Sequence, residues 1–385
     1  MKAERRNAQF PALLALAAMA LAMAVLNLPL VVRAQEGAAL VIDEDCEVFA
    51  IAPNNRIVYA VPRMKRMKKL VIERDEIWIA DGNRRRRIVD PDQFMPVPPP
   101  ATYIVKSLAW SPDGRHIAVS LTTKTFPWQP KQKGKHATED EDDSFDNQKP
   151  QVGPMAGASI AIYMLDDDGH EIPVPGSKDR FIQPGEKATW LAADNTLVYV
   201  TPTKPYTIER VRVPNGPPTP LFAGFTFDAV VWDAPRNRAF AVGQSLSVFG
   251  KTQLTELDLL NERARPIAPL DGYQGGLNVS PSGNKVGFFE DGDTIEILDL
   301  AKPDNPVYVH TGPGRFEWSA DERRILLKRG PEDESNDLVW VGLYDGSFVP
   351  ALHDLRFHDF KITPDGNSLA VTEPGKEVLK IYPLK

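Results

Sequence analysis

Residues 107–120 read SLAWSPDGRHIAVS and contain the pattern that decides the fold. An apolar run ends at Trp110, four turn-forming residues follow, and a second apolar run begins at Ile117. Proline fixes φ, aspartate bonds its own backbone and glycine accepts a positive φ, so these four residues favour a tight turn. The stretch therefore predicts a β-hairpin.

Six further stretches repeat this pattern of apolar run, short turn and second apolar run. They are VFAIAPNNRIVYAV (48–61), KATWLAADNTLVYVT (187–201), AVVWDAPRNRAFAVG (229–243), GLNVSPSGNKVGFFE (276–290), RFEWSADERRILLKR (315–329) and DFKITPDGNSLAVTE (359–373). The residues just before the seven turns are Ile51, Trp110, Trp190, Trp232, Val279, Trp318 and Ile362. Four of the gaps between them are 42, 47, 39 and 44 positions, close to the period of propeller blades, roughly 40–45 residues. We expect the tryptophans to pack between neighbouring blades as core residues.

A second hairpin follows the first in several repeats. It is seen in DEIWIADGNRRRRIV (75–89), SIAIYMLDDDGHEIPV (159–174), IEILDLAKPDNPVYV (295–309) and DLVWVGLYDGSFVPAL (337–352). Two hairpins give four antiparallel strands, which is one propeller blade. The last repeat has chain for only three strands, and AALVIDE (38–44) can supply the fourth.

The predicted fold is all-β: a seven-bladed β-propeller of four-stranded antiparallel blades, with the ring closed by the N-terminal strand joining the last blade. The gap of 80 positions before Trp190 leaves six or eight blades as alternatives, because it is long enough to hide a degenerate unit.

The SPDGR-type turn, followed downstream by an IWIADG-type strand, resembles the WD40-like repeats of the TolB-type propeller family. The most similar stretches are SPDGRHIAVS (111–120) with IYMLDDDG (162–169), and TPDGNSLAVTE (363–373). The resemblance covers nearly all of residues 46–385, and it implies the fold rather than one function. TolB itself is similar to a propeller preceded by a separate α/β domain, and no such domain fits between Gln35 and Cys46.

The first 34 residues have the order of a segment that directs export. MKAERR is basic, an apolar stretch follows at 10–32, and Val-Arg-Ala closes the segment with small residues. This is the pattern of a signal peptide, although the apolar stretch is also long enough for an uncleaved anchor. We predict a signal peptide or anchor at 1–34, a propeller at 35–385, and a periplasmic or secreted location.

Composition and motifs argue against several classes of function. A net charge of −7 argues against a nucleic-acid surface, and Cys46 is the single cysteine, so no internal disulfide forms. The sequence has no G-x-S-x-G elbow and no H-E-x-x-H motif. The acidic runs at 166–168 and 290–293 lack the spacing of a calcium loop, and we expect them to be turns. The prediction is a non-enzymatic protein without cofactor or metal.

The long connections of the propeller should emerge together on one face. Strands in an antiparallel blade alternate in direction, so connections after even-numbered strands leave from the face opposite the PDG turns. These connections are the basic segment 63–69, the Pro-rich segment 91–102, the insertion 124–154 and the acidic segment 331–337. Loops on a rigid scaffold usually carry recognition, which makes this the candidate partner-binding face.

The insertion 124–154 is the candidate docking loop on that face. Its charge runs from basic to acidic, a composition that favours disorder until a partner binds. Aromatic residues beside proline are typical interface anchors, and basic side chains can contact an acidic partner. The candidate partner-binding residues are Phe126, Trp128, Lys131 and Lys133 in the insertion, with Lys65 and Arg66 in the basic segment.

These observations favour an exported, monomeric propeller that acts as a protein-binding or scaffold module at the cell envelope. Its partner is an unidentified protein at the loop-rich face, and no nucleic acid is expected. One alternative is a propeller hydrolase, lactonase or sugar dehydrogenase with a metal in the central channel, which the mainly apolar or small central positions of the inner strands disfavour. Another is a structural envelope protein that an uncleaved N-terminal helix holds at the membrane.

Overall fold

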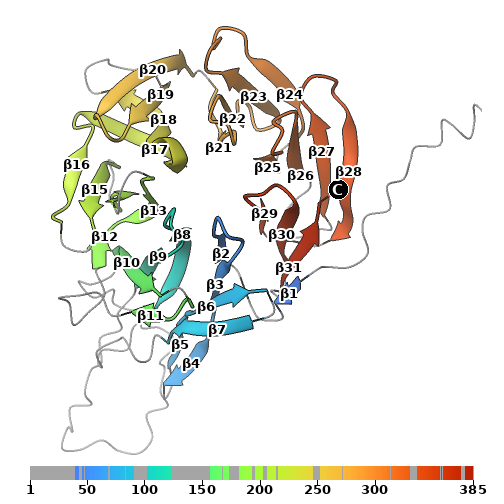
Figure 1. Ribbon diagram of the computed structural model, residues 1–385. Helices are drawn as coiled ribbons and strands as arrows, with labels where there is room; N and C mark the ends of the chain where they lie inside the picture. Colours follow the sequence, from blue (N-terminus) through green and yellow to red (C-terminus); the bar gives the residue numbers. More distant parts are fainter. Residues whose placement is uncertain are drawn as a thin grey trace, which may run out of the picture. The chain divides into compact units, whose positions relative to one another are not determined.

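Seven antiparallel sheets follow one another around a ring, and each corresponds to one of the predicted repeats (Figure 1). The sheets are four-stranded blades, apart from a divided outer strand in the second. The fold is therefore the predicted all-β, seven-bladed propeller. The described residues between Cys46 and Gly185 form two blades and one added hairpin, and the described chain as a whole forms seven blades rather than six or eight.

The computed structural model describes residues 40–384 apart from several gaps. The gaps are 43–45, 47, 68–69, 83, 91–101, 124–156, 167, 173–181, 193–195, 203–205, 214–215, 246–251, 271, 313, 330–335, 356, 358 and 374–377. The propeller belongs to one compact unit, Gly37–Lys385. The predicted export segment 1–34 lies outside the described residues. Within the described part of the chain, no helix is long and apolar enough to span a membrane.

The first three blades contain the largest departures from a regular blade. Blade 1 is β2 (Val48–Ile51), β3 (Ile57–Val61), β6 (Glu76–Asp81) and β7 (Arg84–Val89), with an added hairpin of β4 (Met64–Met67) and β5 (Leu70–Glu73). Blade 2 is β8 (Ile104–Trp110), β9 (His116–Thr123) and β10 (Gly157–Leu165), and its outer strand is divided into β11 (Glu171–Ile172) and β12 (Ile182–Pro184). Blade 3 is β13 (Glu186–Trp190), β14 (Thr196–Val200), β15 (Ile208–Arg212) and β16 (Thr219–Leu221).

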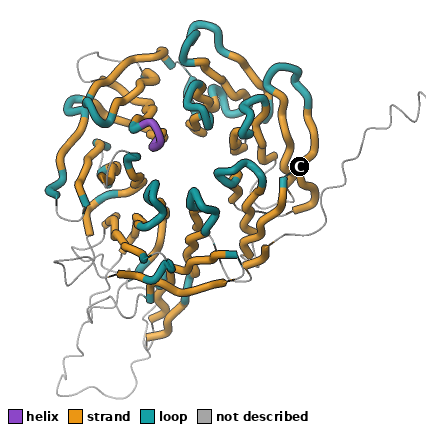
Figure 2. Tube along the Cα trace, in the orientation of Figure 1, coloured by secondary structure: helices purple, strands orange, loops and turns teal. Residues whose placement is uncertain are grey.

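The next three blades are more regular. Blade 4 is β17 (Phe225–Asp233), β18 (Arg238–Ser245), β19 (Gln253–Asp258) and β20 (Arg263–Pro269). Blade 5 is β21 (Gly275–Val279), β22 (Lys285–Phe289), β23 (Thr294–Asp299) and β24 (Val307–His310), and blade 6 is β25 (Gly314–Trp318), β26 (Arg324–Arg329), β27 (Asn336–Gly342) and β28 (Phe348–Leu355). One 3-10 turn, η2 (Ala234–Arg236), stands between β17 and β18 and is the helical segment of the described chain (Figure 2).

The last blade combines the two ends of the propeller sequence. Its inner strands are β29 (Asp359–Ile362), β30 (Ser368–Glu373) and β31 (Val378–Pro383), and its fourth strand is β1 (Leu40–Ile42). Strands β1 and β31 are antiparallel, with Leu40 opposite Ile381 and Ile42 opposite Leu379. Ile42 is fully buried in the cluster that joins blade 7 to blade 1. The N-terminal strand is thus held by both backbone pairing and apolar packing.

A shared set of hydrogen bonds explains the recurring turn sequence. In SPDG, SADE and TPDG, the aspartate accepts from the hydroxyl two residues earlier, as in the 2.6 Å bond from Thr363 Oγ1 to Asp365 Oδ1. The same carboxylate accepts from the backbone N–H two residues later, at 3.1 Å for Asn367. The hydroxyl oxygen accepts the N–H that opens the next strand, at 2.9 Å for Ser368. Ser111–Asp113 and Ser319–Asp321 repeat these contacts, so each turn is closed by its own side chains.

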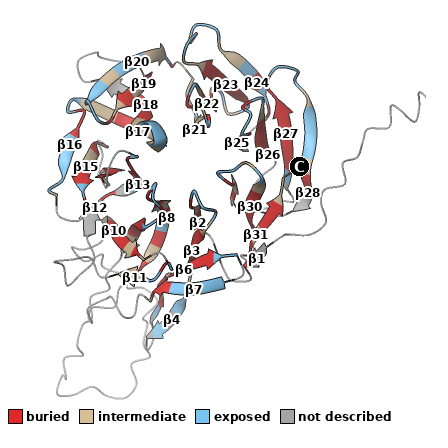
Figure 3. Cartoon of the chain, in the orientation of Figure 1, coloured by how far each residue is buried: buried red, intermediate tan, exposed pale blue. Residues whose placement is uncertain are grey.

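The hydrophobic core consists of layers between adjacent blades. One cluster joins blades 1 and 2 and includes Trp110, and another joins blades 2 and 3 and includes Trp190. The indole N–H of Trp110 donates to the carbonyl of Ala50 at 3.2 Å, and that of Trp190 donates to Ala109 at 3.2 Å. Each indole therefore fastens the inner strand of the preceding blade, which confirms the predicted role of these tryptophans. Burial decreases from the inner to the outer strands: Figure 3 shows exposed stretches on the outer strands β7, β20 and β28.

Candidate functional site

The β4–β5 hairpin occupies the position predicted for the basic segment 63–69. It stands between the second and third strands of blade 1, with Arg66 opposite Val71 and Met64 opposite Glu73. Segment 63–69 connects the second and third strands of the blade, as predicted, but it is not a simple loop, because LVIE at 70–73 pairs back onto it. The added strands give the basic residues a defined register.

One face of this hairpin is unusually apolar for a solvent-exposed surface. The side chain of Met64 is 68% exposed and that of Val71 is 58% exposed, although both are large hydrophobic residues. Arg66 is exposed on the same face, because it is opposite Val71 and two residues from Met64. Ile72 has the opposite orientation and is buried. The exposed face of the hairpin therefore combines two apolar side chains with Arg66 and with the partly exposed Glu73, which is opposite Met64.

The base of the hairpin is fixed to the blade by several hydrogen bonds. The backbone groups of Arg63 and Arg74 bond each other at 3.2 and 2.9 Å. The N–H of Tyr103 donates to the carbonyl of Glu73 at 3.0 Å, and the N–H of Asp75 donates to the carbonyl of Tyr103 at 2.8 Å. The hairpin thus rests on the segment that enters blade 2, and its exposed face has a rigid support.

The outer strand of blade 1, β7, is rich in arginine and positively charged. Strand β7 has the sequence RRRRIV, and Arg84, Arg85 and Arg87 are exposed. Glu76 on β6 partly balances them, with ion pairs of 2.5 Å to Arg87 and 3.2 Å to Arg63. Burial alone would raise the pKa of Glu76, but the hydrogen bonds from Arg87, Trp78 and Arg63 outweigh it and lower the pKa. One carboxylate therefore organises an arginine-rich surface that retains excess positive charge.

The predicted partner-binding residues are only partly placed by the structure. Lys65 and Arg66 both lie on β4, and Arg66 is exposed. Phe126, Trp128, Lys131 and Lys133 lie outside the described residues, as does the rest of the insertion 124–154. The predicted end of the acidic connection 331–337 was two residues too late, because Asn336 and Asp337 already belong to β27.

The central channel has two different sides. One inner-strand residue of each blade occupies the register position immediately before the pre-turn residue. In order of the blades these residues are Ala50, Ala109, Thr189, Val231, Asn278, Glu317 and Lys361. The expectation of mainly apolar or small inner positions therefore holds for the first four blades and fails for the last three.

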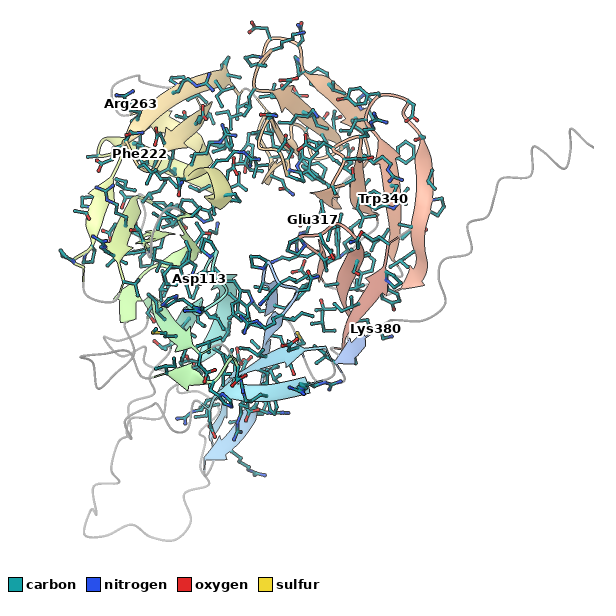
Figure 4. The ribbon with its side chains drawn as sticks, viewed as in Figure 1. Asp113, Phe222, Arg263, Glu317, Trp340 and Lys380 are labelled. Carbon is teal, nitrogen blue, oxygen red and sulfur yellow. The ribbon has the colours of Figure 1, made fainter. Side chains whose placement is uncertain are left out.

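Charged side chains of blades 6 and 7 form a compact network at the channel. Figure 4 places Glu317 on the inner side of blade 6. Arg315, two residues earlier on β25, forms an ion pair with Asp359 of blade 7 and lies 3.8 Å from Glu317. Burial raises the pKa of Glu317, and the attraction of Arg315 and Lys361 only partly offsets this. The carboxylates of this network are thus engaged mainly by Arg315.

A cavity of about 510 Å³ lies where the inner-strand turns of five blades converge. Its lining residues are Ala50, Ile51, Pro53, Ala109, Trp110, Ser111, Pro112, Thr189, Trp190, Ala192, Ala234, Pro235, Lys361, Ile362 and Pro364. We call this space the channel-mouth cavity. Most of the wall formed by the described residues is apolar, and among them Lys361 is the charged residue of the lining. The cavity belongs to the face of the PDG turns, opposite to the face from which the β4–β5 hairpin extends.

The acidic runs considered as metal sites are turns in the described structure. The carboxylate of Asp291 accepts from the N–H groups of Asp293 at 3.1 Å and Thr294 at 2.7 Å. Asp166 accepts from the N–H of His170 at 2.6 Å. Among the residues that the structure describes, no group of three or more His, Cys, Asp or Glu side chains is arranged to hold a metal ion. These aspartates stabilise the backbone, as expected from their spacing.

The fold and these surfaces define the class of protein as a seven-bladed β-propeller. It is similar in structure to a chain of the mitotic checkpoint complex, with a TM-score of 0.56 and 15% identity over 92% of this chain and 94% of that one. It is also similar to the propeller domain of Cps50 (Swd1) from Myceliophteria thermophila, with a TM-score of 0.53 and 12% identity over 90% and 99% of the two chains. No family model and no curated protein matches the sequence, so the TolB-type family is not confirmed.

Proposed function

We propose that this chain is an exported, non-enzymatic propeller that binds a protein partner on the face from which the β4–β5 hairpin extends. The single observation that supports this most directly is the exposed apolar pair of Met64 and Val71 on a rigidly based hairpin. Exposed apolar groups rimmed by polar residues mark interaction sites. That one structural neighbour comes from a protein complex agrees with this proposal.

The chemistry of the surface specifies the kind of partner. Arg66 flanks the apolar pair, and the exposed arginines of β7 extend the positive charge over the same blade. A complementary partner would present an apolar patch bordered by carboxylates, because unlike charges guide encounter and fix the register of docking. The insertion 124–154 follows β9, the second strand of blade 2, just as the hairpin follows the second strand of blade 1. By this parity Phe126 and Trp128 would add aromatic anchors to the contact.

Affinity capture with the full mature chain tests the proposal. The test variant combines Met64→Asp with Val71→Asp, and the matched control combines Tyr344→Asp with Phe348→Asp, another exposed apolar pair on the outer part of blade 6. Quantitative mass spectrometry should identify a partner that the control retains and the test variant loses. Once the partner is known, the test variant should weaken binding by about 2 kcal/mol or more, as expected for central interface residues.

Two further measurements separate the parts of the proposal. Deleting residues 124–154 should weaken capture of the same partner, whereas unchanged capture would remove Phe126 and Trp128 from the contact. N-terminal sequencing of the native protein should begin near Gln35. A native chain that begins at Met1 would instead favour the tethered envelope protein.

A further inference from the structure

We infer that the channel-mouth cavity binds a small amphipathic carboxylate, such as a medium-chain fatty acid. This site is separate from the hairpin face, and it does not depend on the partner proposed above. At about 510 Å³ the cavity is within the size range of small-molecule sites. It is open at the PDG-turn face, where the turns of five blades meet.

The wall of the cavity is apolar and preformed. Pro53, Pro112, Pro235 and Pro364 come from the inner turns of four different blades and line the same space. Proline fixes the backbone φ, and the neighbouring turns are closed by their own side chains, as in Ser111–Asp113 and Thr363–Asp365. A ligand would therefore meet a wall that needs little ordering, which favours binding of an apolar body.

Lys361 gives the site its charge preference. Its Nζ lies 5.5 Å from the centre of the Phe49 ring, and no carboxylate of the described residues lies within ion-pair distance of it. The nearby carboxylates of Asp359 and Glu317 are oriented toward Arg315 instead. An ammonium group at the edge of an apolar cavity attracts an anion, and a carboxylate would accept a charge-assisted hydrogen bond from it.

The asymmetry of the channel gives the ligand one orientation. The charged head would lie toward blade 7, at Lys361, and the apolar body would lie toward blades 1 to 4, against Ile51, Pro112, Ala192 and Pro235. A cation would meet Lys361 with like charge, and a neutral alcohol would lose the charge-assisted contact. The site should therefore prefer a carboxylate to an alcohol or an amine of the same chain length.

Calorimetric titration of the full mature chain with octanoate, octan-1-ol and octylamine tests this inference. Tryptophan fluorescence provides a second readout, because Trp110 and Trp190 line the cavity. Octanoate should bind about 10-fold more tightly than octan-1-ol, and octylamine should bind more weakly than either. The variant Lys361→Met should abolish the preference for octanoate, whereas Lys302→Met, which changes an exposed lysine of the blade 5 turn, should not.

A second variant tests whether octanoate occupies the cavity without changing Lys361. Ala192 is exposed on its turn and lines the cavity, so Ala192→Phe should fill the space without disturbing the core. It should weaken octanoate binding about 10-fold or more, with an unchanged melting temperature. The inference is overturned if octanoate fails to bind at millimolar concentration, if octylamine binds equally well, or if Lys361→Met leaves octanoate affinity unchanged.

Discussion

Replacing residues 38–44 with a Gly-Ser sequence of equal length should destabilise the propeller by about 5 kcal/mol. The replacement keeps the chain length constant, so that the preceding residues do not slide into the position of β1. It removes the fully buried side chain of Ile42, which is worth about 3 kcal/mol when the cavity left behind is included. It also removes the backbone pairing with Leu379–Ile381, about 1 kcal/mol for each hydrogen bond lost.

This loss is large compared with the total stability of a folded domain, typically 5–15 kcal/mol. It should be measured by urea unfolding at equilibrium, followed by tryptophan fluorescence. The variant should also aggregate at lower concentration, because the edge of β31 would be left unpaired. Unfolding that begins in blade 7 would expose the core between blades 7 and 1, where Phe49 and Tyr59 are buried.

A rescue variant makes the prediction sharper. Adding AALVIDE after Lys385 through a short linker, in the Gly-Ser background, would offer the same strand to β31 as a hairpin. Because β1 and β31 are antiparallel, this arrangement preserves the native pairing and should restore most of the lost stability. The reasoning is refuted if the Gly-Ser variant is as stable as the parent, or if the relocated strand restores nothing.

Three other perturbations follow from contacts described above. Trp190→Phe should cost about 1 kcal/mol in urea unfolding, because it removes the hydrogen bond from the buried indole to the half-buried carbonyl of Ala109. Arg238→Met should cost about 2 kcal/mol, because it removes one of the two arginines that pair with the buried Asp233 carboxylate at 2.8 Å, while Arg236 remains. Hydrogen bonds from the Thr363 hydroxyl and the Asn367 N–H lower the pKa of Asp365 to about 2, so its contribution should be complete above pH 4 and disappear as the pH falls through 2. In thermal unfolding, Asp365→Ala should therefore differ from the parent by less than about 1 kcal/mol at pH 6, and by nearly nothing at pH 2.

Local sequence patterns were sufficient to predict the blades. Turns such as SPDG and TPDG contain their own hydrogen-bonding groups, so this signal is independent of distant residues. The tryptophan before a turn recurs at the period of the blades, and each repeat places it against the inner strand of the preceding blade. The three-strand last repeat also predicted that an N-terminal strand completes it, because a blade with an unpaired edge would be incomplete. These features depend on short-range chemistry repeated along the chain.

The hairpin β4–β5 was missed for a different reason. Segment 63–69 was interpreted through its charge, and no strand was assigned to LVIE at 70–73, which pairs with it. Two short runs of alternating pattern, MKRM at 64–67 and LVIE at 70–73, are the signal that could have revealed this hairpin. The exposure of Met64 and Val71 could not be predicted, because a sequence alone does not show which face of a two-stranded sheet is open to solvent.

The channel-mouth cavity also depended on the three-dimensional arrangement. Glu317 and Lys361 stand at the same place in their repeats as Ala50 and Ala109, which an alignment of the seven units would show. The engagement of Glu317 by Arg315 rather than by Lys361 depends on side-chain geometry between blades 6 and 7. The sequence could therefore indicate a polarised channel, but not which charge is free to meet a ligand.

The position of β1 also constrains how the domain can fold during synthesis. Strand β1 (Leu40–Ile42) is the first strand of the propeller to leave the ribosome, yet its partner β31 is the last propeller strand to be made. The remaining six blades pair within themselves, so they can form in order while the first strand waits. Joining the two ends is the contact with the greatest sequence separation in the propeller, and such contacts are slow to form. We therefore expect a late folding step in which a nearly complete, open array of blades exposes its terminal edge, and this intermediate is the one that chaperones would need to protect.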